Sequence, residues 1–211
     1  MAVYLFDFDG TLVDSMPTYT EAFLRILRRF DIPISKDFVK IITPLGYAGA
    51  AKYVLTLGVP MTEEEIVRDV GDFALEAYTQ KIKAKPHVKE TLEALKARGD
   101  ELHVLTASPH MTLDPCLARN GLYSLFTNVW SCEDFATTKA DPAIYRMAAE
   151  RIGKPVSEII FLDDNYDADK TAKSAGMRVY GVFDESSREF AEDIRAITDR
   201  YITDFSELLE D

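Results

Sequence analysis

Two aspartates lie two positions apart near the start of the chain, at the end of an apolar run. Residues 3–8 carry the aromatic and β-branched side chains of a buried strand, and Asp7 and Asp9 close it. Strands are depleted in Asp, and a buried carboxylate is costly unless it is paired or bound to metal. Residues two apart on a strand project to the same side. The pair therefore predicts a cation site and a nucleophile beside an acid/base; the alternative is a strand that ends in a polar turn.

Strand-like and helix-like segments alternate over the second half of the chain. Further strands are predicted at residues 102–106, 128–131, 159–163 and 178–182, with helices between them. This alternation predicts an α/β fold with a Rossmann-like, doubly wound parallel sheet. Ligands bind such sheets outside the carboxyl ends of the strands. The acids that end the first strand and the strand at 159–163 are expected to meet there.

The segment between the first strand and Pro86 has helical patterns only. Ser15 is placed to cap a first helix, shorter helices follow at 36–42 and 46–57, and Thr62 with Glu65 forms a capping box before a long helix. The sequence therefore predicts an α/β core domain of residues 1–14 and 84–211, interrupted by an α-helical domain of residues 15–83. The linkers at 14–16 and 84–87 are the expected hinges.

The composition is that of a globular protein with a strongly negative charge. Of 211 residues, 47% are hydrophobic and 28% charged, and the net charge is -12. Nucleic acid and anionic membrane surfaces are both met by Lys and Arg, so neither is an expected partner. The negative net charge does not exclude an anionic substrate, because the binding site itself can be positive or can hold a metal ion.

Targeting and redox signals point to the cytoplasm. Cys116 and Cys132 are the only cysteines and lie outside any CxxC pattern, which excludes a zinc site and favours reduced, partly buried thiols. The first apolar run lacks a basic flank and is too short for a signal peptide or a membrane span. We therefore expect a cytoplasmic protein with no membrane segment.

The first motif identifies a family. Residues 7–14, Asp-Phe-Asp-Gly-Thr-Leu-Val-Asp, match the DxDGTLxD motif of the haloacid dehalogenase superfamily of phosphatases in full. Motif order and the position of the helical insert resemble its members with a helical cap, the group of phosphoglycolate phosphatases and β-phosphoglucomutases. The resemblance implies that Asp7 is the nucleophile that accepts the phosphoryl group. It also implies that Asp9 is the general acid/base and binds the metal through its backbone carbonyl, whereas Asp14 is a solvated helix-entry residue.

The second and third motifs resemble phosphate-binding segments. In residues 103–108, the Thr106 hydroxyl and the N–H groups of Ala107 and Ser108 would hold phosphate oxygens at a strand-to-helix turn. Many relatives carry Asn where this chain has Ser108. Residues 139–142 resemble the third motif, with Ala140 in place of its first proline. The resemblance makes Lys139 the cation that stabilises the transferring group, so the expected catalytic residues are Asp7, Asp9, Thr106 and Lys139.

The fourth motif supplies the remaining metal ligands. Aligning the small residues of the following helix with those of the family puts Asp164 on the principal metal-binding acid, and Asp163 is a second ligand or supports the first. Because adjacent strand residues point in opposite directions, the two are not expected to ligate equally. With Asp7 and Asp9, these acids form an all-oxygen set that suits Mg²⁺. Asp167 and Asp169 are expected to be solvated, as are His87 and His110.

The sequence is compatible with four hypotheses about the function. The leading one is a Mg²⁺-dependent phosphatase that hydrolyses a small phosphorylated metabolite through an aspartyl phosphate on Asp7, as a monomer or homodimer. The second is a phosphotransferase or mutase of the β-phosphoglucomutase type; residues 43, 45–47 and 52, where cap loops of the family meet substrate, show no clear mutase signature. Dehalogenases of the superfamily lack an acid at the position of Asp9, which disfavours carbon–halogen cleavage. A non-catalytic phosphate-binding protein is the fourth.

Overall fold

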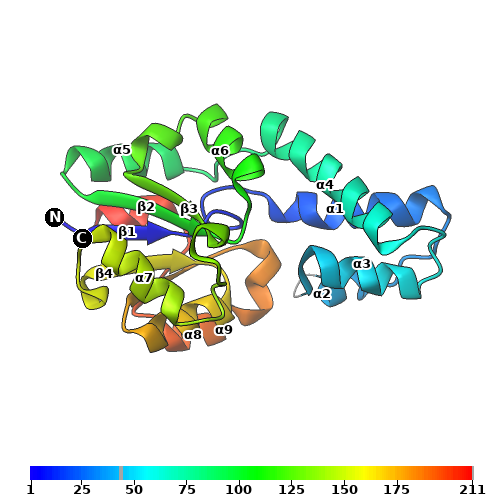
Figure 1. Cartoon of the computed structure of the whole chain (residues 1–211). Coiled ribbons are helices and arrows are strands. Elements are labelled where there is room, and N and C mark those ends of the chain that lie inside the picture. The colour runs from blue at the N-terminus through cyan, green and yellow to red at the C-terminus, as the bar shows by residue number, and fades with distance from the viewer. Residues whose placement is uncertain (43–44, 211) are drawn as a thin grey trace. The chain divides into compact units, whose positions relative to one another are not determined.

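One parallel sheet organises the α/β part of the chain (Figure 1). The computed structural model describes residues 1–42 and 45–210. Within those residues the sheet has six strands in the order β3-β2-β1-β4-β5-β6. Their bounds are β1 (Val3–Phe6), β2 (Glu101–Thr106), β3 (Asn128–Ser131), β4 (Ile159–Asp163), β5 (Arg178–Val182) and β6 (Arg200–Ile202). The predicted doubly wound sheet is confirmed, with β1 at its centre; the short β6 was not predicted.

Helices cover both faces of this sheet. Figure 1 shows α5 and α6 on one side of the strands and α7, α8 and α9 on the other. Leu5 and Phe161 pack with Tyr145 in the apolar core of the second face. Phe6, which follows Leu5, points to the opposite face and stacks on Phe205 with 6.1 Å between ring centroids. The helices are α5 (Val88–Ala97), α6 (His110–Arg119), α7 (Ala143–Ile152), α8 (Tyr166–Ala175) and α9 (Ala191–Ile197).

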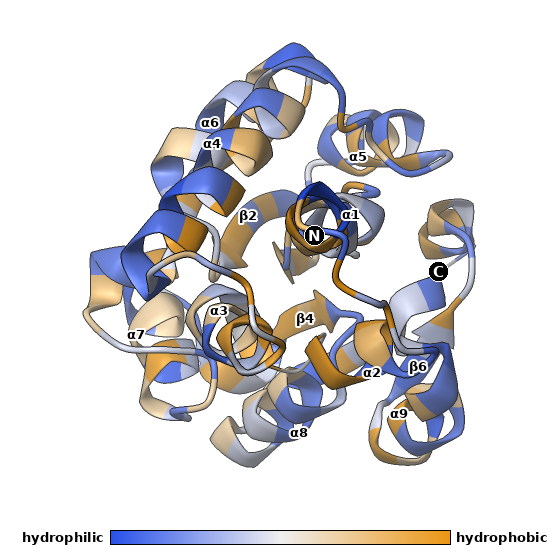
Figure 2. Cartoon of the chain, turned by 90° about the vertical axis from the view of Figure 1, so that its right-hand side faces the viewer, coloured by the Kyte–Doolittle hydropathy of each residue, from blue (hydrophilic) through white to orange (hydrophobic). Residues whose placement is uncertain are grey.

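Burial on two faces explains the composition of the strands. Every residue of β1 and β4 is buried. Figure 2 shows β4 mainly in the colour of hydrophobic residues, with polar residues along the surrounding helices. A parallel sheet covered on both sides requires such continuous apolar runs. The runs therefore predicted these strands well.

Residues Ser15–Ile82 form one compact unit, and residues Met1–Asp14 and Lys83–Asp211 form the other. The helices of the Ser15–Ile82 unit are α1 (Met16–Arg29), α2 (Phe38–Ile42), α3 (Gly46–Thr56) and α4 (Glu63–Gln80). Phe23, Ile26 and Ile66 belong to its own apolar core. None of the helices over the described part of the chain is long and apolar enough to cross a membrane.

Two helix caps predicted in this unit have different outcomes. The Thr62 hydroxyl accepts from Glu65 N at 3.2 Å and the Glu65 carboxylate accepts from Thr62 N at 2.8 Å, so the capping box is confirmed. Ser15 makes no side-chain cap. Its backbone already has helical angles, φ −101° and ψ −21°, whereas a capping residue is extended.

Of the predicted substrate-contacting positions, residue 43 lies outside the described residues.

The chain leaves and re-enters the α/β unit through paired segments. Asp14 N donates to Lys83 O at 3.0 Å, Val13 and Ala84 form an antiparallel bridge, and Lys85 N donates to Leu12 O at 3.0 Å. Ala84 N also donates to Asn120 Oδ1. The start of the linker predicted as the second hinge is therefore hydrogen-bonded to the segment that follows β1 and to Asn120.

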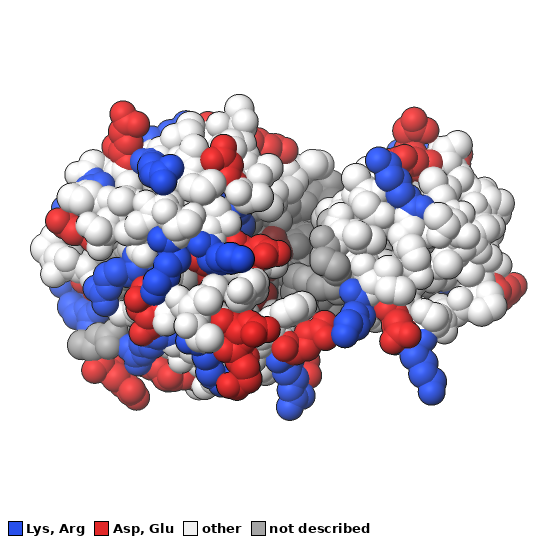
Figure 3. Space-filling model, turned by 90° about the horizontal axis from the view of Figure 1, so that it is seen from below, with Lys and Arg blue, Asp and Glu red and all other residues white. Residues whose placement is uncertain are grey.

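The charged surface is mixed in sign. On the face seen in Figure 3, Lys and Arg side chains lie among Asp and Glu side chains rather than in one continuous field. Together with the net charge of -12, this distribution offers no electrostatic footprint for a nucleic-acid backbone on that face.

Candidate active site

Three carboxylates converge where β1 and β4 end. Asp7, Asp163 and Asp164 are buried, and each offers an oxygen within 4.8 Å of those of the other two. The register of the sheet explains the meeting: Phe6 pairs with Leu162, and Asp7 N donates to Leu162 O at 2.8 Å. The last residue of β4 is Asp163, so Asp164 lies beyond the strand and strand alternation does not separate the two acids. That the two acids ligate unequally stays a prediction; their partners in the structure differ, since Asp163 contacts Lys139 and Asp164 accepts from Thr11.

Lys139 lies within this acid cluster. Its Nζ contacts Asp7 Oδ1 at 2.6 Å and Asp163 Oδ2 at 2.7 Å, and its side chain is 15% exposed. The residue precedes α7, whose Tyr145 hydroxyl donates to the Lys139 carbonyl at 3.2 Å. A cation at this position offsets part of the repulsion between the carboxylates and leaves an excess of negative charge.

Burial and mutual repulsion shift the ionisation of these groups. Burial raises the pKa of Asp7 to about 6, with Lys139 opposing the shift and Asp163 adding to it. Burial, then the charges of Asp163 and Asp7, hold the pKa of Asp164 well above its usual range. Burial alone would lower the pKa of Lys139, but the two acids it contacts outweigh it and raise that pKa. The cluster is therefore poised to gain protons or a cation.

The tight turn after β1 brings two further residues to the cluster. Thr11 Oγ1 donates to Asp164 Oδ1 at 3.0 Å. Gly10 has φ +74°, and a Cβ at this position would lie 2.6 Å from Asp164 Oδ2. Both the backbone conformation and the close approach therefore require glycine. The bond from Thr11 was not predicted, although its place in the Asp-Gly-Thr motif was the available signal.

Asp9 has a different environment from Asp7. Its Oδ2 accepts from Ser108 Oγ at 2.5 Å, and Ser108 N donates to Thr106 Oγ1 at 3.1 Å. Since β1 ends at Phe6, the two aspartates do not belong to one strand, and alternation does not set their directions. The Asp9 carboxylate lies outside the three-acid cluster. Ala107 lies in the turn between Thr106, which ends β2, and Ser108.

Asp169 was wrongly expected to be solvated. It is 0% exposed, and neither carboxyl oxygen has a hydrogen-bond partner among the described residues. It shares the buried face of α8 with Ala168, Ala172 and Ala175. The helical spacing of 169, 172 and 175 was the missed signal. Asp167, by contrast, is exposed as expected.

The surroundings of two histidines differ from one another. His87 is exposed, as expected, and its Nδ1 lies 2.7 Å from Asp204 Oδ2. His110 is only partly exposed, because it opens α6 and both its ring nitrogens lie 2.9 Å from carboxylates, those of Asp114 and Asp134. The i, i+4 spacing of His110 and Asp114 was visible in the sequence.

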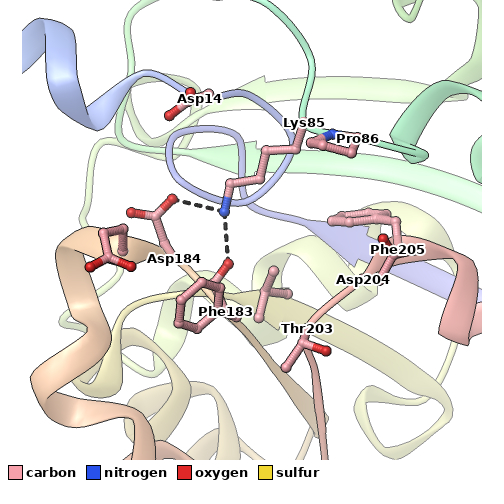
Figure 4. Close-up of a pocket in the computed structure, with 10 residues that line it drawn as sticks. Asp14, Lys85, Pro86, Phe183, Asp184, Thr203, Asp204 and Phe205 are labelled. Atoms are coloured by element: carbon pink, nitrogen blue, oxygen red, sulfur yellow. Dashed lines mark hydrogen bonds and ion pairs between the residues drawn. The ribbon is translucent and has the colours of Figure 1, made fainter.

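A pocket of about 290 Å³ lies in the α/β unit at the ends of β5 and β6 (Figure 4). Lys85 crosses it, and Figure 4 shows its ammonium bonded to Phe183 O and to the Asp184 carboxylate, each at 2.8 Å. Asp184 raises the pKa of Asp164 and Lys85 lowers it, although burial is the largest cause of that shift. The buried pair therefore contributes to the electrostatics of the acid cluster, a role not predicted from the sequence.

The donor set of the cluster fits a hard divalent cation. It supplies carboxylate oxygens only, which is the chemistry that Mg²⁺ and Ca²⁺ prefer over softer metals. Three buried carboxylates face one lysine, so their full ionisation leaves negative charge that Lys139 alone does not balance. Asp7, Asp163 and Asp164 could therefore hold a metal ion.

Comparison with known proteins gives consistent relatives. A model of the haloacid dehalogenase-like hydrolase family matches residues 4–182. A phosphorylated carbohydrates phosphatase of Thermotoga maritima is 27% identical over 86% of this chain and 85% of its own length. A phosphoglycolate phosphatase of Haemophilus influenzae is 28% identical over 84% and 83%, respectively.

Among solved structures, a predicted phosphoglycolate phosphatase of Haemophilus somnus superposes with a TM-score of 0.82 at 26% identity, covering 100% of this chain and 97% of that one. The family model spans both the motif around Asp7 and the segment around Asp164, the two parts of the chain that the sheet brings together. By its sequence match, its fold and the order of its motifs, the chain belongs to the haloacid dehalogenase-like hydrolase family.

Proposed function

We propose that this protein is a Mg²⁺-dependent phosphatase that hydrolyses a small phosphorylated metabolite through an aspartyl phosphate on Asp7. The observation that carries the proposal is the contact of Lys139 with Asp7 at 2.6 Å inside a buried three-acid cluster. A buried carboxylate with one fixed cationic partner is suited to attack an anionic group whose charge must be neutralised.

Hydrolysis would proceed in two displacements. An oxygen of Asp7 forms a bond to phosphorus as the bond to the ester oxygen breaks, and Asp9 gives that oxygen its proton. Asp9 then takes a proton from water, whose oxygen attacks phosphorus and releases phosphate from Asp7. The hydrogen bond from Ser108 to Asp9, 2.5 Å long, supports this role because it fixes the Asp9 carboxyl at the edge of the site.

The remaining residues bind and orient. Thr106, the N–H groups of Ala107 and Ser108, and Lys139 would hold the non-bridging phosphate oxygens. Asp7, Asp163, Asp164 and the backbone carbonyl of Asp9 would hold Mg²⁺, with Thr11 orienting Asp164. When bound, Mg²⁺ supplies positive charge that offsets the repulsion between the carboxylate and the phosphoryl group.

The substrate class follows that of two relatives, a phosphorylated carbohydrates phosphatase and a phosphoglycolate phosphatase. Phosphorylated carbohydrates and phosphoglycolate are small phosphomonoesters, and we extend that class to this chain. No feature of the described residues favours phosphoryl transfer to a sugar hydroxyl over transfer to water, so hydrolysis is the activity we propose.

The test is phosphate release from a panel of small phosphomonoesters, with Mg²⁺ and with EDTA. We expect release that requires Mg²⁺, and a ranking of esters that narrows the substrate. Hexose phosphates in the panel should also be analysed for isomerised products, which would indicate a mutase instead. Folded protein that binds Mg²⁺ and releases no phosphate from any ester would contradict the proposal.

The variant Asp7→Asn tests the nucleophile. It should lower the rate by at least about a thousandfold, because an amide does not form the acyl phosphate. Asp167→Asn is the matched control, since Asp167 is an exposed acid outside the cluster, and it should retain the rate of the parent. Circular dichroism should show that both variants are folded. Undiminished activity in Asp7→Asn would overturn the assignment of Asp7.

A further inference from the structure

His110 connects two loops of the site through a pair of carboxylates. Its Nδ1 lies 2.9 Å from Asp114 Oδ1, on the same helix, and its Nε2 lies 2.9 Å from Asp134 Oδ2. Asp134 belongs to the short helix Cys132–Phe135 that follows β3, where it also accepts from Ser131 N. The ring therefore bridges the segment after β2 to the segment after β3.

The geometry determines the ionisation state of the ring. An ionised carboxylate only accepts hydrogen bonds, and a neutral imidazole has only one N–H to donate. Two short contacts to two carboxylates are satisfied together only when both ring nitrogens carry hydrogen, which is the imidazolium form. Hydrogen bonds from the ring to Asp114 and Asp134 correspondingly raise the pKa of His110.

The two bridged segments carry residues of the proposed site. The segment after β2 contains Ser108, which lies two residues before His110. The Ser108 hydroxyl contacts the Asp9 carboxylate. The segment after β3 leads from Asp134 to Lys139, which contacts Asp7 and Asp163. Thr106 and Ser131, the last residues of the two strands, are partners in the sheet register, so the loops start side by side.

We propose that protonated His110 is a positioning residue that clamps the Ser108 turn to the Lys139 segment, and that its deprotonation lowers the activity at alkaline pH. This inference rests on the proposed function, because Ser108 and Lys139 are the groups it positions. When the ring loses a proton, it can donate to only one of the two carboxylates. The bond to Asp134, which is the one that joins the two loops, is lost in the tautomer that keeps its proton on Nδ1.

The charges that surround the ring agree with this assignment. Asp114 faces it from α6 and Asp134 from the Cys132–Phe135 helix. Arg151 of α7 donates to the Asp134 carbonyl and lies over the Phe135 ring. Of the elements packed on α6, β3 has no ionisable residue, and the short helix Tyr123–Leu125 contains no Asp, Glu, His, Lys or Arg.

The kinetic test compares pH profiles of kcat/KM with p-nitrophenyl phosphate as the probe and saturating Mg²⁺. His110→Gln should lower the plateau several-fold and lack the alkaline limb of the parent. His110→Arg, which stays charged and can reach two carboxylates, should restore the plateau without that limb. Asp114→Asn should move the limb down by roughly one pH unit, because one of the two charges that favour the imidazolium is gone.

A second measurement is independent of turnover. NMR spectra of the ring protons and nitrogens, recorded over a range of pH, should show that His110 titrates at a higher pH than an ordinary histidine and that both ring nitrogens are protonated at pH 7. The pH of this titration should coincide with the alkaline limb of the kinetic profile. A neutral ring at pH 7, or an unchanged alkaline limb in His110→Arg, would overturn the clamp even if the phosphatase activity is present. If the parent protein has a protonated His110 ring but shows no phosphatase activity, the result contradicts the proposed function instead.

Discussion

The carboxyl group of Asp169 is buried in α8 with neither oxygen hydrogen-bonded within the described residues. Burial, then the charges of Asp163 and Asp164, hold its pKa well above the usual range, so the group is neutral in the folded protein over a wide range of pH. In the unfolded chain it ionises near pH 4. Its contribution to stability is therefore complete below about pH 4 and is lost as the pH rises toward the folded-state pKa.

Replacing Asp169 with leucine should stabilise the protein. The apolar side chain removes an unpartnered polar group, so the free energy of unfolding should rise by roughly 1–3 kcal/mol at pH 8 and by less at pH 4. Urea denaturation in EDTA measures the difference. Asp167→Leu is the control at an exposed position of the same helix and should change little. A loss of stability at pH 8 would mean that the carboxyl group has an essential partner.

Metal affinity should depend on the ionisation of Asp7. Because burial raises its pKa to about 6, Asp7 gains a proton at a higher pH than an exposed aspartate does. A ligating carboxylate must be ionised, so the affinity for Mg²⁺ should fall by about tenfold per pH unit below pH 6. Calorimetry in two buffers of different ionisation enthalpy would detect the proton released on binding. A constant affinity between pH 5 and 7.5 would contradict this assignment.

At the scale of the elements, close packing decides the effect of a glycine. Gly71 lies on α4 with nothing within 4 Å of a Cβ built there, whereas a Cβ on Gly49 of α3 would lie 2.9 Å from Leu45 Cβ. Gly71→Ala should therefore raise stability by about 0.5–1 kcal/mol through helix propensity. Gly49→Ala should gain less than Gly71→Ala, or lose stability, because Leu45 must move. Thermal unfolding of the two variants gives the comparison, and equal gains would show that α3 accommodates the methyl group freely.

The sequence predicted those elements whose pattern is strong and local. The predicted ranges of β3, β4 and β5 match the structure, and β4 is the clearest case because its first four residues are all apolar. The strand β6 has three residues, one of which is Arg200, so its sequence shows no clear strand pattern. Its strand conformation is stabilised by pairing with β5. In the same way, the motifs located the acid cluster. The contacts of Thr11 with Asp164, of Lys85 with Asp184 and of His110 with Asp134, by contrast, join residues far apart in sequence and depend on the packing of loops.

At the scale of the whole molecule, the helical unit of Ser15–Ile82 has an apolar core of its own. We therefore expect the excised segment to give a helical circular dichroism spectrum and to unfold cooperatively. Its capping box provides an internal check, since Thr62→Ala should lower its stability by about 1 kcal/mol. A broad, non-cooperative transition would show that this core is insufficient without the α/β unit. The role of this unit as a cap remains a prediction from the family resemblance.

The central position of β1 has a consequence for synthesis on the ribosome. This strand emerges first, but its neighbours are β2, which begins at Glu101, and β4, which begins at Ile159. The sheet therefore closes late, through contacts of long sequence separation that are slow to form. Meanwhile the intervening helical segment is complete and has mainly local contacts to make. Folding during translation should thus start in the inserted helices. The first strand and Asp7 should stay exposed to solvent until β2 and β4 have been synthesised and bury them.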